Sequence, residues 1–180
     1  EENVFAEGPY KIAVEHGDPE TEGPDKPYFS GSTDIDVAAR HVNTAQVTAH
    51  VAKSQTFVRI TEAFAKFYHD AEFTVTTGSG NEFTFRPDGT GDPERIWVKT
   101  GTTLSVSGTA RSQSQDGEKE GPLYTFPAET LDATVAATCH IFTFDASNAG
   151  SASLNIVLGE GEGETRVIPV ELNEEAIPSK

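Results

Sequence analysis

The sequence predicts an all-β protein, a β-sandwich with one short amphipathic helix. Apolar and polar residues alternate in many short runs, as in Val47, Ala49 and Val51, and a period of two is typical of strands with one buried face. The 16 Gly and 10 Pro among 180 residues interrupt these runs as often as many tight turns require. A helical period of apolar residues occurs once, in the middle of the strand pattern.

This helix is predicted near residues 60–71. Apolar residues at positions i, i+3, i+4, i+7, i+8 and i+11 lie on one face of a helix, and they are Ile60, Ala63, Phe64, Phe67, Tyr68 and Ala71. Thr61 or Thr56 is expected to cap the N-terminus, and Glu62 in the first turn favours the helix dipole. Because an aromatic face needs a sheet to cover it, the helix is expected to plug the end or side of the sandwich.

The other runs predict strands and hairpins. Strands are expected over 10–15, 27–37, 46–51, 57–60, 73–77, 82–85, 96–99, 104–107, 131–141, 154–158 and 166–172. Gly-rich turns indicate a hairpin between 73–77 and 82–85 and another between 96–99 and 104–107. The junction at 52–54 divides the chain into an N-terminal β module, residues 1–53, and a C-terminal β-sandwich module, residues 54–180.

Charge and chain ends restrict the classes of function. The net charge of −16, from 13 basic and 29 acidic residues, repels phosphate backbones and excludes a nucleic-acid partner. A solvated acidic surface suits an extracellular protein. The chain has no initial Met and no apolar leader, which indicates a processed or trimmed chain. No segment approaches the ~20 apolar residues that span a membrane.

The single cysteine, Cys139, excludes an internal disulfide, so core packing must stabilise the fold. The residues at odd positions from Leu131 to Ile141 are all apolar, which predicts that Cys139 faces inward as an inert thiol. The five histidines have no metal-ligand spacing, and no catalytic motif is present. We therefore expect no enzymatic activity.

Three aromatic residues are candidate ligand-binding residues. Trp97 is out of phase with Ile96 and Val98, so it either lies on the opposite face, available to stack on a sugar ring, or is turned inward by a bulge. With Tyr28 and Tyr124, an exposed Trp97 would form the platform of a carbohydrate-binding module.

A calcium site is the only cofactor for which the sequence offers candidates. Asp88, Asp92 and Glu94 supply three oxygen donors on the Gly-rich stretch RPDGTGDPER, although their spacing matches no EF-hand. The alternative is a plain turn, since turns use the same residue types. Asp34 and Asp36 alternate along a strand and are expected on its exposed face.

Several segments together carry a family resemblance: YKIAVEHG, PYFSGSTDIDV, AQVTAHVAKSQTFVRI, FAKFYHDAEFTVTT and HIFTFDASNAGSASLNIVL. The chain resembles a family of secreted Bacteroidetes lipoproteins of unknown function. The resemblance implies tandem β-sandwich modules of the fimbrillin and transthyretin or immunoglobulin-like type, anchored at the outer-membrane surface by an N-terminal lipid. It also implies that the first module lacks its first strands and the lipid-bearing cysteine. An open sheet edge is then expected near residues 1–40, which another chain or a missing N-terminal piece could fill by strand addition.

Two functions follow as hypotheses. The first is a non-enzymatic cell-surface protein of the adhesin or pilus-accessory type, acting through contacts with a glycan or another surface protein. The second is a carbohydrate-binding module of a surface glycan-uptake system, built on the aromatic candidates. An enzyme with paired carboxylates is the least supported class, because no motif marks a nucleophile or an acid–base pair.

Overall fold

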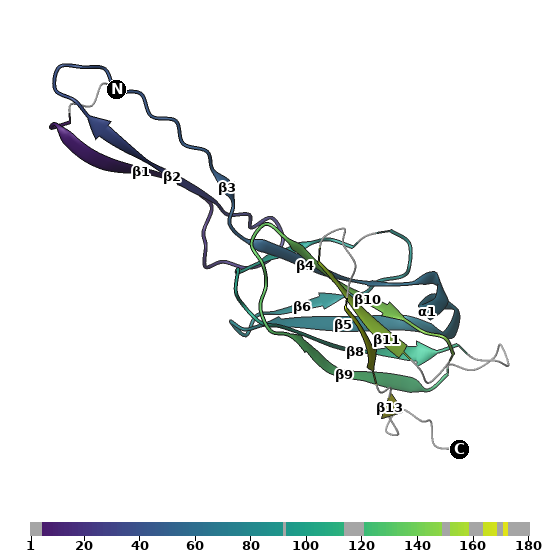
Figure 1. The fold of residues 1–180 in the computed structure, drawn as a ribbon. Coiled ribbons are helices and arrows are strands. Elements are labelled where there is room, and N and C mark those ends of the chain that lie inside the picture. Colours follow the sequence, from purple (N-terminus) through teal and green to yellow (C-terminus); the bar gives the residue numbers. More distant parts are fainter. Residues whose placement is uncertain are drawn as a thin grey trace.

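The computed structural model describes residues 5–91, 93–113, 121–148, 152–158, 164–168 and 171–172. It contains three β-sheets and one short helix (Figure 1). Two five-stranded sheets form a sandwich, and a small three-stranded sheet projects from one end of it. The predicted fold class is confirmed.

The projecting N-terminal sheet comes first in the chain. It consists of β1 (Gly8–His16), β2 (Phe29–Val37) and β3 (His50–Val51), in the order β1-β2-β3 and all antiparallel. The register pairs Gly8 with Val37 at the outer end and His16 with Phe29 at the end next to the sandwich.

The first sandwich sheet has the strand order β12-β11-β10-β4-β7. Its strands are β4 (Ser54–Ile60), β7 (Ile96–Val98), β10 (Cys139–Asp145), β11 (Ala152–Leu158) and β12 (Glu164–Ile168). The β10–β4 pair is parallel and the other pairs are antiparallel. The parallel pair lies at the centre of the sheet, where it joins segments more than 80 positions apart in the sequence.

The second sandwich sheet has the order β13-β9-β8-β5-β6 and is antiparallel throughout. Its strands are β5 (Tyr68–Thr77), β6 (Glu82–Phe85), β8 (Leu104–Ser112), β9 (Leu123–Leu131) and β13 (Glu171–Leu172). The predicted hairpin between 73–77 and 82–85 is confirmed as part of the β5–β6 pair.

Helix α1 (Glu62–Phe67) connects β4 in the first sandwich sheet to β5 in the second. Thr61 is the N-cap, as expected, because its hydroxyl accepts a hydrogen bond from the Phe64 N–H at 3.0 Å. The predicted range of 60–71 is too long. A β-bulge between His69 and Glu72, with Asp70 at φ 49°, brings both Tyr68 and Ala71 inward from β5. This three-residue step within a strand mimics the spacing of a helix.

Aromatic side chains from both sandwich sheets and α1 fill the core at the helix end. The rings of Phe73 and Phe144 stack with their centroids 3.9 Å apart, and Phe64 lies over Tyr68 at 4.7 Å. All four side chains are at most 1% exposed. The helix therefore closes one end of the sandwich, as the sequence predicted.

Three strand predictions are wrong. Residues 96–99 and 104–107 form no hairpin, because β7 pairs with β4 in the first sandwich sheet while β8 pairs with β5 and β9 in the second. The turn at Gly101, with φ 75°, crosses between the two sheets. The expected strand 46–51 contributes only His50 and Val51, although the preceding residues run so close to β2 that a Cβ at Gly31 would meet the Thr48 carbonyl.

The third error concerns 131–141. Residue 131 ends β9, residues 132–138 form a loop with Val135 52% exposed, and Cys139 begins β10. The buried residues of that strand include His140, Phe142 and Phe144, and Cys139 is only half-buried, packed against the margin of the core. The alternation of apolar residues continues through the loop between β9 and β10, so periodicity alone did not show where one strand ends and the next begins.

Candidate functional site

The N-terminal sheet has no core of its own. Gly23 is the only buried residue in the range 5–52. Tyr10, Ile12 and Val14 of β1 lie on the same face as Ile35 and Val37 of β2, because the register pairs even positions of β1 with odd positions of β2. Ile12 and Val14 are 36% and 38% exposed. One face of this sheet is therefore apolar. Its β1 side chains Ile12 and Val14 are exposed among the described residues, whereas the backbone at 48–49 lies against Gly31 of β2 on the same face.

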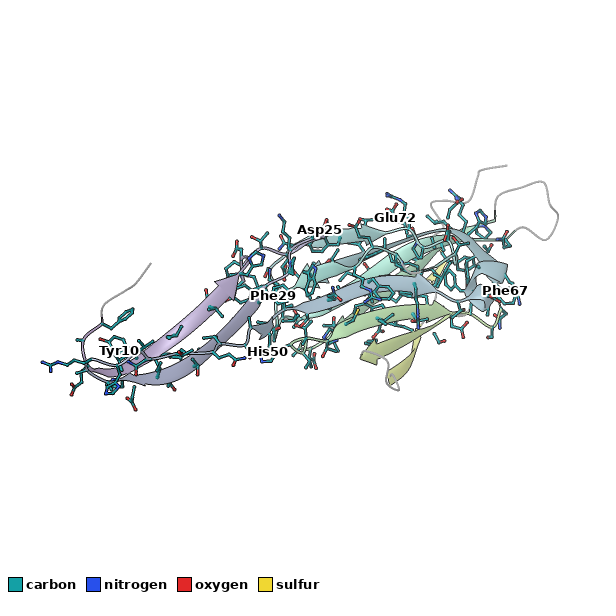
Figure 2. The ribbon with its side chains drawn as sticks, turned by 90° about the horizontal axis from the view of Figure 1, so that it is seen from above. Tyr10, Asp25, Phe29, His50, Phe67 and Glu72 are labelled. Atoms are coloured by element: carbon teal, nitrogen blue, oxygen red, sulfur yellow. The ribbon has the colours of Figure 1, made fainter. Side chains whose placement is uncertain are left out.

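The opposite face is polar. Lys11 pairs with Asp34, Pro9 with Asp36 and Glu15 with Ser30, and Asp34 and Asp36 are exposed as predicted. Figure 2 shows side chains on both sides of the sheet, with Tyr10 near its outer end and with Phe29 and His50 where it meets the sandwich. An amphipathic sheet of this kind normally has its apolar face packed against another layer.

One edge of the N-terminal sheet is open. Within the part of the chain that the structure describes, β1 pairs only with β2, so all nine residues of β1 have a free side. An edge strand presents unpaired N–H and C=O groups that another strand can bond. Phe5 extends the apolar face at the outer end, where its ring centroid lies 5.4 Å from that of Tyr10.

A polar joint fixes this sheet to the sandwich, and Lys53 is its centre. Lys53 is 2% exposed, and its ammonium donates to the carbonyl oxygens of Asp18, Thr21 and Lys26 at 2.6, 2.5 and 3.1 Å. An ammonium has three N–H donors, and here each donor has a carbonyl. Lys53 thereby holds the β1–β2 connection against the start of β4.

Glu22 forms the second part of the joint. Its carboxylate accepts hydrogen bonds from the Thr77 hydroxyl at 2.6 Å, the Asn81 side-chain amide at 2.8 Å and the Lys99 backbone N–H at 3.0 Å. Next to it, Gly23 and Trp97 exchange two backbone hydrogen bonds of 2.9 Å. The connection is thus bonded to both sandwich sheets.

Electrostatics at the joint follow from burial and hydrogen bonding. Burial lowers the pKa of Lys53, and the nearby Asp18 and Glu22 carboxylates oppose that shift. For Glu22, burial disfavours the ionised form. The hydrogen bonds from Lys99, Thr77 and Asn81 outweigh burial and lower its pKa. The Glu22 carboxylate is therefore ionised at neutral pH. For Lys53, the three carbonyl acceptors match the three N–H groups of the ammonium form.

The structure separates the three aromatic candidates. Trp97 is half-buried in the middle of β7, opposite Gln55, and lies at the joint. Tyr28 is also next to the joint, on the polar face of the N-terminal sheet; burial, followed by the charge of Glu15, raises the pKa of its hydroxyl. Tyr124 lies in the second sandwich sheet at the opposite end, where its ring meets Tyr68 edge-on at 5.6 Å. The three do not form one platform.

The acidic candidates lie in the loop before β7. The Asp88 carboxylate accepts hydrogen bonds from the Thr90 backbone N–H at 2.8 Å and from the Thr90 hydroxyl at 2.7 Å, as in an ordinary turn. Glu94 is exposed, and Asp92 lies outside the described residues. No group of three metal-ligating side chains occurs among the residues that are described. The calcium site stays a prediction.

A cleft beside α1 is another surface feature with several polar groups. It is lined in part by His69, Asp70, Arg86 and Asp88. These groups already bind partners: His69 Nδ1 lies 2.9 Å from Asp70 Oδ2, and Arg86 Nη2 lies 2.6 Å from Glu72 Oε2. Among the described residues, the edge of β1 and its side chains Ile12 and Val14 have no such partners, so the N-terminal sheet is the stronger candidate.

Comparison with known proteins gives one result. The sequence matches, over residues 2–174, the family described as Domain of unknown function (DUF4493). The chain belongs to this DUF4493 family. Comparisons with curated proteins and with solved structures gave no match. In the described part of this DUF4493 chain, no helix is both long and apolar enough to cross a membrane.

Sequence reasoning found the open edge but missed the joint. Lys53 and Glu22 have no local signal, because a lysine at a junction and a glutamate in an acidic loop are both typical of solvent-exposed positions. Their partners lie 27 to 77 positions away in the sequence. Only the folded chain brings them together.

Proposed function

We propose that this protein is a non-enzymatic cell-surface protein of the adhesin or pilus-accessory type, which acts through contacts of its N-terminal sheet with another surface protein. The observation that carries the proposal is the pair of exposed apolar side chains on β1, Ile12 and Val14, beside the open edge of that strand in the described chain. Because β3 has only two residues, this sheet is close to a two-stranded hairpin, which is marginal on its own. A partner strand at β1 would therefore add apolar burial and backbone hydrogen bonds.

The joint supports this function mechanically. Lys53 and Glu22 together make six hydrogen bonds that connect the β1–β2 loop with the sandwich. A partner that pulls on the N-terminal sheet would transmit the force through these hydrogen bonds to both sandwich sheets. The sheet therefore projects as a supported arm (Figure 1).

We further propose a location outside the cell, at the outer-membrane surface. The net charge of −16 and the resemblance to secreted Bacteroidetes lipoproteins support it, and in such proteins an N-terminal lipid supplies the membrane attachment. Fimbrillin and transthyretin-like modules of that kind are consistent with the two-sheet sandwich.

A carbohydrate-binding module of a surface glycan-uptake system is the second candidate. Trp97 and Tyr28 favour it, because both are half-buried residues at the same joint. A glycan array with the soluble chain, with calcium present or chelated, tests this function. Binding that disappears in Trp97→Ala would establish sugar recognition, and dependence on calcium would assign the 88–94 loop as a metal site.

The experiment for the first function is saturation binding of fluorescently labelled chain to intact Bacteroidetes cells. Ile12→Ser combined with Val14→Ser makes the apolar face polar and is expected to reduce binding at least tenfold. Val135→Ser changes an apolar residue of similar type on an exposed sandwich loop, 52% exposed, and is expected to bind as the unmodified chain does. Equal binding by all three proteins would exclude the N-terminal sheet as the contact surface.

A further inference from the structure

We propose that β1 pairs with β1 of a second copy of this chain, antiparallel and about a two-fold axis at Ile12. This inference rests on the proposed function, because it names the partner of the N-terminal sheet. A two-fold interface requires a surface that is complementary to itself. The three observations that follow show that β1 meets this requirement.

The apolar face of β1 is symmetric about Ile12. In the proposed register, Ile12 lies opposite Ile12 of the second copy, and Tyr10 lies opposite Val14 in both directions. Aromatic and β-branched residues are favourable cross-strand pairs. The same register extends each apolar face, which continues on β2 with Ile35 and Val37. The result is one six-stranded sheet with a continuous apolar side.

The polar face of β1 is complementary in charge. Lys11 would lie directly opposite Ala13 of the second copy and diagonally next to its Glu15, within reach of a long side chain. The two Lys11 residues are diagonal neighbours as well, but each also pairs with Asp34 of its own β2. Pro9, which has no N–H to donate, lies outside the central segment from Tyr10 to Val14.

The shape of the molecule permits this pairing. β1 begins at the outer end of the N-terminal sheet and ends next to the sandwich (Figure 1). Antiparallel pairing therefore places the outer end of one copy beside the inner end of the other. The two sandwiches then lie at opposite ends of the joined sheet, where they do not collide.

Long-range charge opposes the association. Each copy has a net charge of −16, and the repulsion between two such copies is screened over a length of about 8 Å at physiological ionic strength. The dimer is therefore expected to become tighter as salt increases. An interface dominated by the Lys11–Glu15 pairs would become weaker.

Disulfide trapping tests the register. In a Cys139→Ala background, Ile12→Cys places two thiols opposite each other on the axis, where opposed Cα atoms are about 4.5–5.5 Å apart, a distance that a disulfide spans. Mild oxidation is expected to convert most of this variant to a covalent dimer. Val14→Cys is the matched control, because it has the same face and similar exposure but lies opposite Tyr10. It is expected to dimerise at least tenfold more slowly.

A mixture of Tyr10→Cys and Val14→Cys chains completes the test. These two variants are expected to form a mixed disulfide faster than either forms one with itself, because the register places them opposite each other. Sedimentation of the unmodified chain at increasing concentration and salt provides the reversible measurement. We expect the fraction of dimer to rise with protein concentration and with salt.

Two results would overturn the proposal. One is an equal rate of disulfide formation for Ile12→Cys and Val14→Cys, which indicates random collision. The other is a chain that sediments as a monomer at every concentration and salt. If the monomeric chain still binds cells and the double Ser variant does not, the proposed function stands and the partner strand comes from another protein. If substitutions in the N-terminal sheet change neither cell binding nor dimer formation, both the proposed function and the proposed dimer are wrong.

Discussion

The N-terminal sheet is antiparallel and the sandwich is largely antiparallel, but apolar side chains are mostly exposed in the first and buried in the second. In the described part of the sandwich, 20 hydrophobic residues are buried in one core cluster formed by the two sheets and α1. In the N-terminal sheet, Gly23 is the only buried residue between 5 and 52, and it lies in the β1–β2 connection. Alternation of apolar and polar residues thus produces a core only where a second layer covers the apolar face.

The joint shows the other difference between the regions. Aromatic packing holds the sandwich together, whereas hydrogen bonds from a buried ammonium and to a carboxylate hold the N-terminal sheet to it. Packing is distributed over many residues, but the joint depends mainly on Lys53 and Glu22. We therefore expect single substitutions in the two regions to differ in their effect on the free energy of unfolding.

The largest effect is expected in the sandwich core. Phe144→Ala removes a ring that is 1% exposed and stacked on Phe73, and it should lower the free energy of unfolding by about 3–5 kcal/mol. Urea denaturation followed by circular dichroism measures this change. Phe5→Ala, which removes an equal ring that is 58% exposed, is the matched control and should cost at most ~0.5 kcal/mol. Similar losses of unfolding free energy in Phe144→Ala and Phe5→Ala would contradict the difference in burial between the two regions.

The next largest effect is expected at the joint. Lys53→Met keeps the length of the side chain but removes every donor, so three carbonyl groups lose their partner. A loss of about 1–3 kcal/mol is expected. Amide hydrogen exchange should accelerate most in residues 17–28.

Lys66→Met, on the exposed side of α1, is the control for Lys53→Met and should leave this exchange unchanged. Protection of residues 17–28 that persists in Lys53→Met would show that Lys53 does not hold the joint.

A smaller effect, confined to the sandwich, is expected from pH. His140 is fully buried, its Nε2 accepts a hydrogen bond from the Val135 N–H, and burial lowers its pKa below 6.5. As the pH falls below 6.5, the unfolded chain takes up the proton first. The free energy of unfolding therefore decreases until the pH reaches the lower pKa of the folded state.

Denaturation at about pH 7.5 and pH 5 measures this dependence on His140. His140→Gln cannot titrate and should show a smaller decrease over this range. His50→Gln, at the exposed start of β3, should keep the profile of the unmodified chain. An identical profile for His140→Gln would exclude His140 as the source.

The smallest effect is expected in the N-terminal sheet. Ile12→Ala truncates a side chain that is 36% exposed and, in dilute solution where the chain is monomeric, should change the free energy of unfolding by at most ~0.5 kcal/mol. The same substitution should weaken the proposed dimer in concentrated solution. A large loss in dilute solution would mean that another part of the chain covers this face.

Local features were predictable from the sequence. The β5–β6 hairpin follows from alternation around a Gly-rich turn, and the N-cap Thr61 follows from its position before Glu62. The bounds of α1 were not predictable from periodicity, because the bulge after His69 gives a strand the spacing of a helix. The partners of β7 and β8 were not predictable either, since neighbours in sequence joined different sheets.

For the candidate site, the family resemblance implied an open edge near residues 1–40, but nothing in the sequence indicated the residues that support it. Sequence reasoning grouped Trp97, Tyr28 and Tyr124 as aromatic residues that could stack on a sugar if exposed. The fold separates Tyr124 from the other two by the length of the sandwich. Sequence reasoning did not indicate Lys53, whose three carbonyl partners come from a loop that precedes it by 27 to 35 residues.

The sequence by itself determined the all-β class, the short helix and the outward position of Asp34 and Asp36 on β2, because these depend on the order of residues along a few turns or strands. The tertiary structure decided which apolar faces are covered and which partners a buried charge finds, because both depend on contacts between segments far apart in the chain. The sandwich residues gained a second layer in this way. The described residues of the N-terminal sheet did not, and its apolar face is the surface that we assign to a partner.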